Sequence, residues 1–281
     1  MTTLPREQKE TSPTLFRANP ILHRLSKVQE RAESNTATYA GISSKVFFFL
    51  ALTLVGLIAQ LLVSNAYVNE PVWQTLSIQK FTFTLTKIET IIFAAVTIVG
   101  FICQLVGVFA RRTVPFTGSV YAASQGYFIS FLVFKVLKGY EYLGLEALLL
   151  TVAVIAVMSW LYTSGKIQVN EKFRTILFSL LIGSIAVGLF SFIGYLIPFT
   201  RPFVQAMTQN VGLAIAMDVL GIVIASLFLV SDFHVIDTCV RDGYPRNYEW
   251  FAAFGLVFTV IWLYLKILDL IMRIAGNSKS K

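Results

Sequence analysis

Five stretches of this chain run without a single charged residue for as long as a helix needs to cross a lipid bilayer. They span residues 46–69, 90–110, 113–134, 147–165 and 175–200. A hydrocarbon core of roughly 30 Å needs about 20 apolar residues in a helix. Two further apolar runs, about 210–231 and 250–272, are interrupted by charges. We therefore expect an all-α polytopic membrane protein with seven transmembrane helices.

The connections between these runs are mostly short, which favours one bundle of antiparallel neighbours over residues 46–274. A polar leader, 1–45, precedes the bundle, and a polar tail, 275–281, follows it. Within the leader, 19–33 places apolar residues on one helical face and basic residues on the other. This segment is either an interfacial helix on the membrane or a solvated tail. We place the seven helices at about 46–66, 90–110, 116–136, 145–164, 174–198, 210–232 and 249–272.

Composition excludes several other classes of protein. The chain is 56% hydrophobic and 14% charged, which excludes a soluble globular domain. Its net charge is +8, but the basic residues gather at the ends of apolar runs and form no stripe for nucleic acid. We expect the partners to be the lipid bilayer and, at the basic leader, anionic lipid. Cys103 and Cys239 lie in unlike surroundings, so we expect no disulfide.

The distribution of lysine and arginine predicts an orientation. With seven crossings, 14 of these residues lie on the side of the N-terminus and 9 on the other side. Because cytoplasmic loops carry the excess of positive charge, we expect the N-terminus in the cytoplasm and the C-terminus outside.

Charged side chains inside the last two apolar runs are the main candidates for function. Asp218 and Asp232 are 14 residues apart, which places them within about 40° on one helix face and roughly 21 Å apart. On an antiparallel neighbouring helix, Lys266 would reach the depth of Asp218. We expect Asp218 and Lys266 to form an ion pair directly or through water, because each alone is costly in lipid. In the alternative, Lys266 and Asp269 only extend to the outer headgroups.

Titratable groups also cluster where the sixth run ends. Asp232, His234 and Asp237 are expected at the cytoplasmic mouth of the bundle, where a histidine between two acids suits pH sensing. With Asp218, they form the candidate ion or proton site. Two carboxylates at the mouth suffice for a weak, transient site for calcium ions, and we expect no high-affinity metal site and no cofactor. Because hydrolase, metalloprotease and phosphate-loop motifs are missing from the sequence, we expect no enzyme.

Several short sequence motifs of this chain resemble those of the bacterial Bax inhibitor-1-like membrane proteins. The resemblance extends over roughly residues 18–274. Its strongest part is the closing region, and weaker matches lie in the leader, the third helix and the segment after the fourth. The matching motifs are SDFHVI (231–236), GYPR (243–246), EWFAAFGL (249–256), WLYL (262–265), NP (19–20), YAA (121–123), LYTSGKI (161–167) and EKFR (171–174).

The resemblance implies a seven-helix fold in which the last helix is central. It also implies an association with proton-sensitive calcium leak, with suppression of cell death in eukaryotes, or with regulation of membrane proteases in bacteria. In the channel members of that family, aspartates on helices six and seven share a proton, and a basic residue from helix two closes the pore. By this resemblance, Asp232 is the aspartate of helix six, and Arg111 or Arg112 is the basic residue.

At other positions the sequence departs from the family pattern. Depending on the alignment, Lys266 or Thr259 replaces the acid of helix seven. Gln125 stands where bacterial relatives carry a glutamate. The leading hypothesis is a calcium- and proton-sensitive cation leak channel or ion-flux modulator in a bacterial cytoplasmic (plasma) membrane. The alternative is a non-conducting scaffold that binds and regulates another membrane protein, such as a protease.

Overall fold

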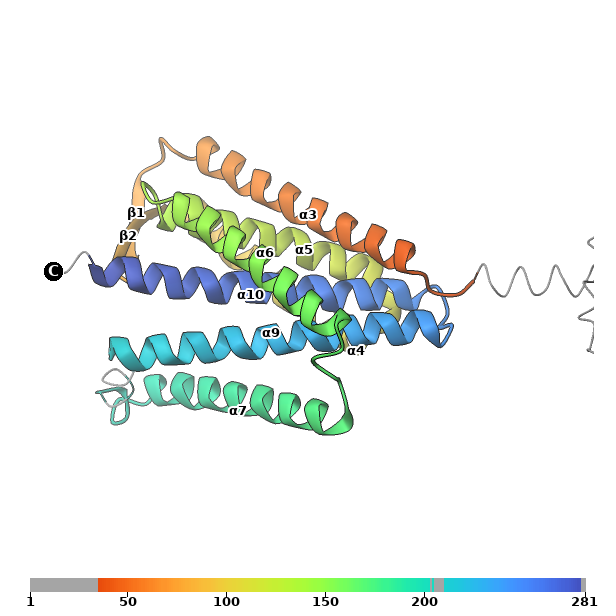
Figure 1. Cartoon of the computed structure of the whole chain (residues 1–281). Coiled ribbons are helices and arrows are strands. Elements are labelled where there is room, and N and C mark those ends of the chain that lie inside the picture. Colours follow the sequence, from red (N-terminus) through yellow and green to blue (C-terminus); the bar gives the residue numbers. More distant parts are fainter. Residues whose placement is uncertain (1–34, 203, 205–209, 279–281) are drawn as a thin grey trace, which may run out of the picture.

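The computed structural model describes residues 35–202, 204 and 210–278, and nearly all of them are helical. The interfacial helix expected at 19–33 lies outside these residues. Figure 1 shows long helices that run back and forth, with a β-hairpin at one end. The helices are α3 (Tyr39–Ala66), α4 (Lys87–Phe109), α5 (Val114–Ser130), α6 (Tyr142–Thr163), α7 (Glu171–Leu196), α9 (Val211–Arg241) and α10 (Tyr248–Ser278).

Six of the described helices are long and apolar enough to cross a membrane, namely α3, α4, α6, α7, α9 and α10. The remaining long helix, α5, has 17 residues. It continues without a break into a six-residue π-helical turn, η2 (Phe131–Val136). The polytopic α-helical membrane protein expected from the apolar runs is therefore confirmed.

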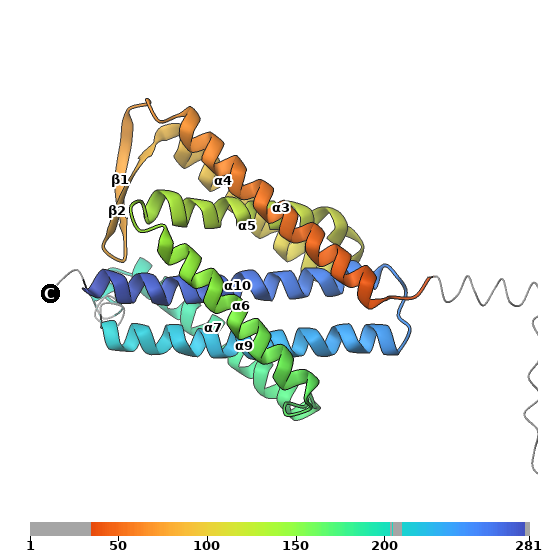
Figure 2. The same ribbon diagram turned by 45° about the horizontal axis from the view of Figure 1, so that its top comes forward.

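The last helix contacts four of the other long helices. α10 packs against α3, α5, α6 and α9, while α7 lies at the periphery and packs against α9 (Figures 1 and 2). We call the end where α3 begins the leader end and the end that carries the β-hairpin the hairpin end. The α9–α10 connection lies at the leader end, and α10 ends at the hairpin end (Figure 1).

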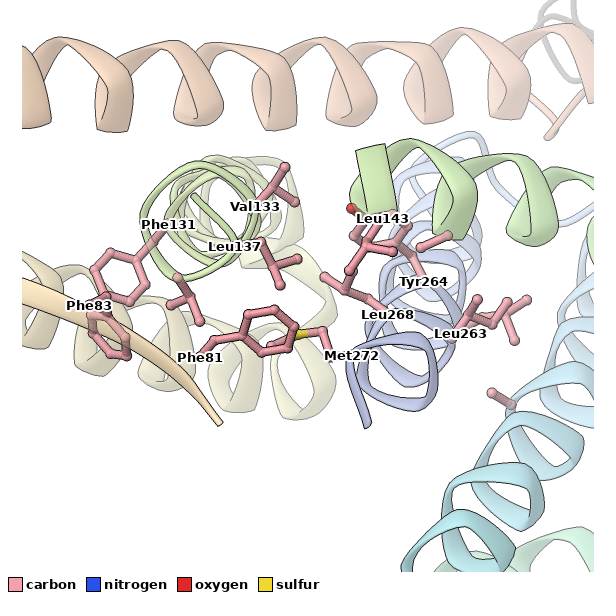
Figure 3. Close-up of a cluster of buried hydrophobic side chains, with 14 of the residues drawn as sticks. Phe81, Phe83, Phe131, Val133, Leu137, Leu143, Leu263, Tyr264, Leu268 and Met272 are labelled. Carbon is pink, nitrogen blue, oxygen red and sulfur yellow. The ribbon is translucent and has the colours of Figure 1, made fainter. Parts of the chain in front are cut away.

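The β-hairpin is the main departure from the expected all-α fold. Strands β1 (Val72–Ile78) and β2 (Phe81–Thr86) pair antiparallel within the long connection after α3. Along β2, Phe81, Phe83 and Leu85 are buried, whereas the threonines at 82 and 84 are exposed. Figure 3 shows Phe81 and Phe83 packed beside η2 and the end of α10. This alternation with period two predicts a strand, but the expectation of helices alone did not use it.

The sixth helix is longer than expected from the sequence. α9 continues to Arg241, so that His234 and Asp237 lie within the helix and not in a loop. A Schellman motif ends it: the Tyr244 amide donates to the carbonyl of Cys239, and Gly243 adopts a positive φ of 63°. The seventh helix also extends further, since α10 runs to residue 278 and leaves little of the expected polar tail.

Glycines bring α3 and α5 into backbone contact. A Cβ atom on Gly126 of α5 would lie 1.8 Å from the carbonyl oxygen of Thr53 in α3. A Cβ atom on Gly56 of α3 would likewise lie 1.8 Å from the carbonyl oxygen of Ala123. Such close approach maximises van der Waals contact between helices in lipid.

Substitution of Gly126 by alanine tests this contact. Because the obstructing atom is backbone, the helices must separate, and we expect Gly126→Ala to lower the free energy of unfolding by about 1–3 kcal/mol. Gly188→Ala in α7 is the matched control, since a Cβ atom there meets nothing within 4 Å. Unfolding of the two variants in mixed micelles, followed by circular dichroism, measures the difference. Equal stability of the two variants would contradict the close packing.

Candidate functional site

The interface between α9 and α10, which we call the seam, contains an aspartate without a charged partner. One carboxylate oxygen of Asp232, Oδ2, is buried and accepts no hydrogen bond. The Thr259 side chain on α10 faces the carboxylate, and Thr259 is itself only 3% exposed. Within the described ranges, no basic nitrogen lies within ion-pair distance of Asp232. Since α9 continues nine residues, or about 14 Å, beyond Asp232, this carboxylate lies inside the bundle and not at its mouth.

Of the two residues considered for the helix-seven position, Thr259 is the one that lies against Asp232. Lys266 lies two helical turns further along α10, where its aliphatic stem packs beside Gly221 of α9. A neutral hydroxyl therefore occupies the place where the resemblance implied a second acid.

Asp218 lies near the hairpin end of the same seam and is paired. Its Oδ2 atom accepts a hydrogen bond of 2.6 Å from Nε of Arg273 on α10. The expected direct ion pair between Asp218 and Lys266 is therefore wrong. The prediction ended helix seven at residue 272 and so left Arg273 outside the helix that supplies the partner. Both Asp218 and Asp232 contact α10, which confirms that they share one face of α9.

Arg273 connects this pair to the hairpin. Its guanidinium also lies 3.8 Å from a carboxylate oxygen of Asp269. The Gln79 side chain at the tip of the β-hairpin donates a hydrogen bond to Asp269. The hairpin tip is therefore held against α10 by a polar network that includes Asp218.

A cavity of about 590 Å³ adjoins Asp218 between α4, α5, α7, α9 and α10. Its lining is mostly apolar, and its polar side chains come from all five of these helices. Gln125, singled out as a departure from the family pattern, is one of them. The others include Gln104, Asp218 and Lys266.

Neither arginine after α4 reaches Asp232. The Arg111 guanidinium stacks over the rings of Tyr248 and Phe251, with 5.8 and 5.2 Å between the guanidinium carbon and the ring centroids. Arg111 and Arg112 are both exposed at the leader end. The expected contact between one of these arginines and Asp232 is therefore not formed in this structure.

Asp237 has a set of partners at the leader end. It accepts hydrogen bonds from the hydroxyls of Tyr39, at 2.5 Å, and Tyr162, at 3.3 Å, and pairs with Arg241 at 2.9 Å. These contacts join α3, α6 and α9. His234 is partly exposed and lies on α9 about one turn before Asp237.

Two buried glutamates received no role from the sequence. Glu249, at the start of α10, is fully buried, pairs with Lys45 of α3 and accepts hydrogen bonds from the Thr38 amide and hydroxyl. Glu89 of α4 pairs with Lys135 of η2 at 2.6 Å. Each of these charges borders an apolar run in the sequence. Their position at the ends of apolar runs therefore indicated that these glutamates are of interest, but it did not identify the lysine with which each one pairs.

The part of the chain that the structure describes contains no cluster of three or more histidine, cysteine, aspartate or glutamate residues suited to a metal ion. A lone buried carboxylate can exchange a proton or attract a cation weakly, and intramembrane acids of this kind usually mark ion or proton pathways.

Apolar helices of membrane-spanning length, together with buried acids between α9 and α10, define a helical integral membrane protein with polar groups inside its bundle. The chain belongs to the Bax inhibitor 1 like family, whose model matches residues 19–276. A search of curated proteins found no match.

Removal of the Glu249 carboxylate tests its structural role. We expect Glu249→Ala to lower the free energy of unfolding by about 3–5 kcal/mol, because Lys45, whose side chain is only 13% exposed, would lose its counter-charge. Glu171→Ala is the matched control: its carboxylate, also near the start of a helix, is 93% exposed and lies 3.9 Å from Arg174. Denaturant unfolding in micelles measures both variants. A Glu249→Ala protein as stable as Glu171→Ala would show that the buried pair contributes nothing.

Proposed function

We propose that this protein is a cation leak pathway or ion-flux modulator, with Asp232 as its intramembrane proton or cation site. The observation that carries the proposal is the buried Oδ2 atom of Asp232, which has no hydrogen-bond partner. A carboxylate in such a place is stabilised by a proton or by a cation that passes. Membership of the Bax inhibitor 1 like family supports a function of this type.

The path that we propose follows the seam between α9 and α10. Asp218 lines the cavity towards the hairpin end, and Asp232 lies about 21 Å further along the same face of α9. In this proposal α5 with η2 is the seventh crossing, and α10 is the central helix against which the others move. The Asp218–Arg273 pair would close the hairpin end, since a cation that enters there must compete with Arg273.

We further propose calcium as a permeant ion and a bacterial cytoplasmic membrane as the location, with the N-terminus in the cytoplasm. The excess of lysine and arginine on the side of the N-terminus supports this orientation. No catalytic chemistry is assigned to the chain.

The second candidate is a non-conducting scaffold that binds another membrane protein. One observation favours it: within the most apolar window of α7, only 6% of the residues are buried inside the bundle. Such a helix offers a broad apolar face to lipid or to a partner helix. A scaffold would hold a partner in fixed stoichiometry and would give no flux of its own.

Removal of the Asp232 charge tests the leak proposal. Liposomes that contain the protein should take up calcium faster than empty liposomes, as followed with an entrapped fluorescent indicator. Asp232→Asn keeps the shape of the side chain and removes its charge. We expect it to lower the flux about tenfold, the factor that corresponds to about 1.4 kcal/mol of lost attraction for the cation.

The matched control for this experiment is Asp242→Asn, since Asp242 is exposed at the end of the same helix. Its flux should equal that of the wild type. Wild-type flux no greater than that of empty liposomes would defeat the leak proposal, and a partner that co-purifies at fixed stoichiometry would then favour the scaffold.

Installing the missing acid provides an independent test. Thr259→Asp would place a second carboxyl group against Asp232, and two carboxyl groups in contact hold a proton between them. We expect the calcium flux of Thr259→Asp to depend on pH more steeply than that of the wild type. Thr259→Asn, which is similar in size and cannot ionise, is the control. Identical pH profiles for the two variants would show that position 259 does not contact the ion path.

A further inference from the structure

A recess of about 390 Å³ at the leader end joins the α4–α5 connection to the start of α10. It lies apart from the α9–α10 seam and is not used by the proposed ion path. Its lining combines two arginines with three aromatic side chains. The lining residues are Arg111, Arg112, Pro115, Asn247, Tyr248, Trp250 and Phe251.

The two arginines supply positive charge that no acid neutralises. Among the described residues, neither Arg111 nor Arg112 forms an ion pair, and both are exposed. The Arg111 guanidinium lies over the rings of Tyr248 and Phe251, which hold it in place. Contact with ring faces does not use the N–H groups of a guanidinium, so they can bind a phosphate.

Two helix N-termini strengthen this positive potential. α5 begins at Val114, directly after the arginines, and α10 begins at Tyr248. The Val114 amide bonds to the carbonyl of Arg111, and Pro115 has no amide hydrogen. The contribution of these helix starts is therefore the partial positive charge of the helix dipole. The nearest acid on α10, Glu249, is fully buried and bound to Lys45 and Thr38, so it does not offset the charge of the recess.

The surroundings of the recess place it at the boundary between hydrocarbon and water. The apolar helix α4 ends at Phe109, just before the arginines. Phe109 and Phe116 flank them and are 83% and 72% exposed. With Trp250, they form the kind of aromatic belt found at membrane interfaces. A lipid whose anionic headgroup fills the recess would therefore place its acyl chains beside these exposed phenylalanines.

We propose that this recess is a binding site for the phosphate headgroup of an anionic membrane lipid. Arg111 and Arg112 donate hydrogen bonds to the phosphate, and the first turns of α5 and α10 add their dipoles. Phe109 and Phe116 contact the acyl chains. Basic recesses between transmembrane helices at a cytoplasmic surface bind anionic headgroups in the same way. A bound lipid would join the α4–α5 connection to α10 and stabilise the leader end of the bundle.

Lipid titration of the full chain tests the site. Purified protein in mild detergent is titrated with phosphatidylglycerol or phosphatidylcholine, and bound lipid is counted by native mass spectrometry. Wild-type protein should retain phosphatidylglycerol in preference to phosphatidylcholine. In the double variant R111Q/R112Q, we expect phosphatidylglycerol to bind at least about tenfold more weakly, since each arginine near the surface contributes to the attraction.

The control is the double variant K172Q/R174Q, which removes two exposed positive charges at the same end of the bundle, from the start of α7. It should bind phosphatidylglycerol as the wild type does. If R111Q/R112Q does not fold, R112Q alone keeps the ring contacts of Arg111 and should weaken binding about fivefold.

Three results would overturn the proposal. One is an equal loss of phosphatidylglycerol binding in both double variants, which would show that binding depends only on the net charge of the protein. Another is equal retention of phosphatidylglycerol and phosphatidylcholine by the wild type. The third is full displacement of the lipid by millimolar inorganic phosphate, which would assign the recess to the free anion.

Discussion

A charge can lie within an apolar bundle only if a counter-charge or a polar network meets it there, and this requirement determines how the helices of this protein are joined. Glu249 and Lys45 join the start of α10 to the start of α3 at the leader end. At the hairpin end, Arg273 joins α10 to Asp218 of α9 and, through Asp269, to the hairpin. These pairs connect segments far apart in sequence, so they fix which helix ends meet.

Asp232 does not follow this rule, and its lack of a charged partner gives the seam between α9 and α10 its functional interest. Its neighbour across the seam is Thr259, which can satisfy only part of a carboxylate. An incompletely paired acid in the membrane lowers stability, and such acids are usually functional. Because Thr259 carries a neutral hydroxyl, it offers Asp232 no second acid with which to share a proton.

The sequence predicted the helices well and their contacts less well. Uncharged runs located the spans because the bilayer imposes a length that can be counted. The hairpin was missed because its alternation is short, and the end of α9 was missed because a helix that leaves the hydrocarbon can continue with polar residues. The shared face of Asp218 and Asp232 followed from helical period alone. Helical period could not predict the partner of Asp218, because the choice between Lys266 and Arg273 depends on how far α10 extends and how it is shifted along α9.

The central claim is that Asp232 is a carboxyl group that responds to cations or protons, whereas the paired acids are held by their partners. Infrared difference spectroscopy of the reconstituted protein tests it directly. On addition of calcium or a change of pH, the account predicts a carboxyl band that is present in the wild type and lost in Asp232→Asn. A difference spectrum that is the same in both proteins would show that Asp232 is silent and would contradict the account.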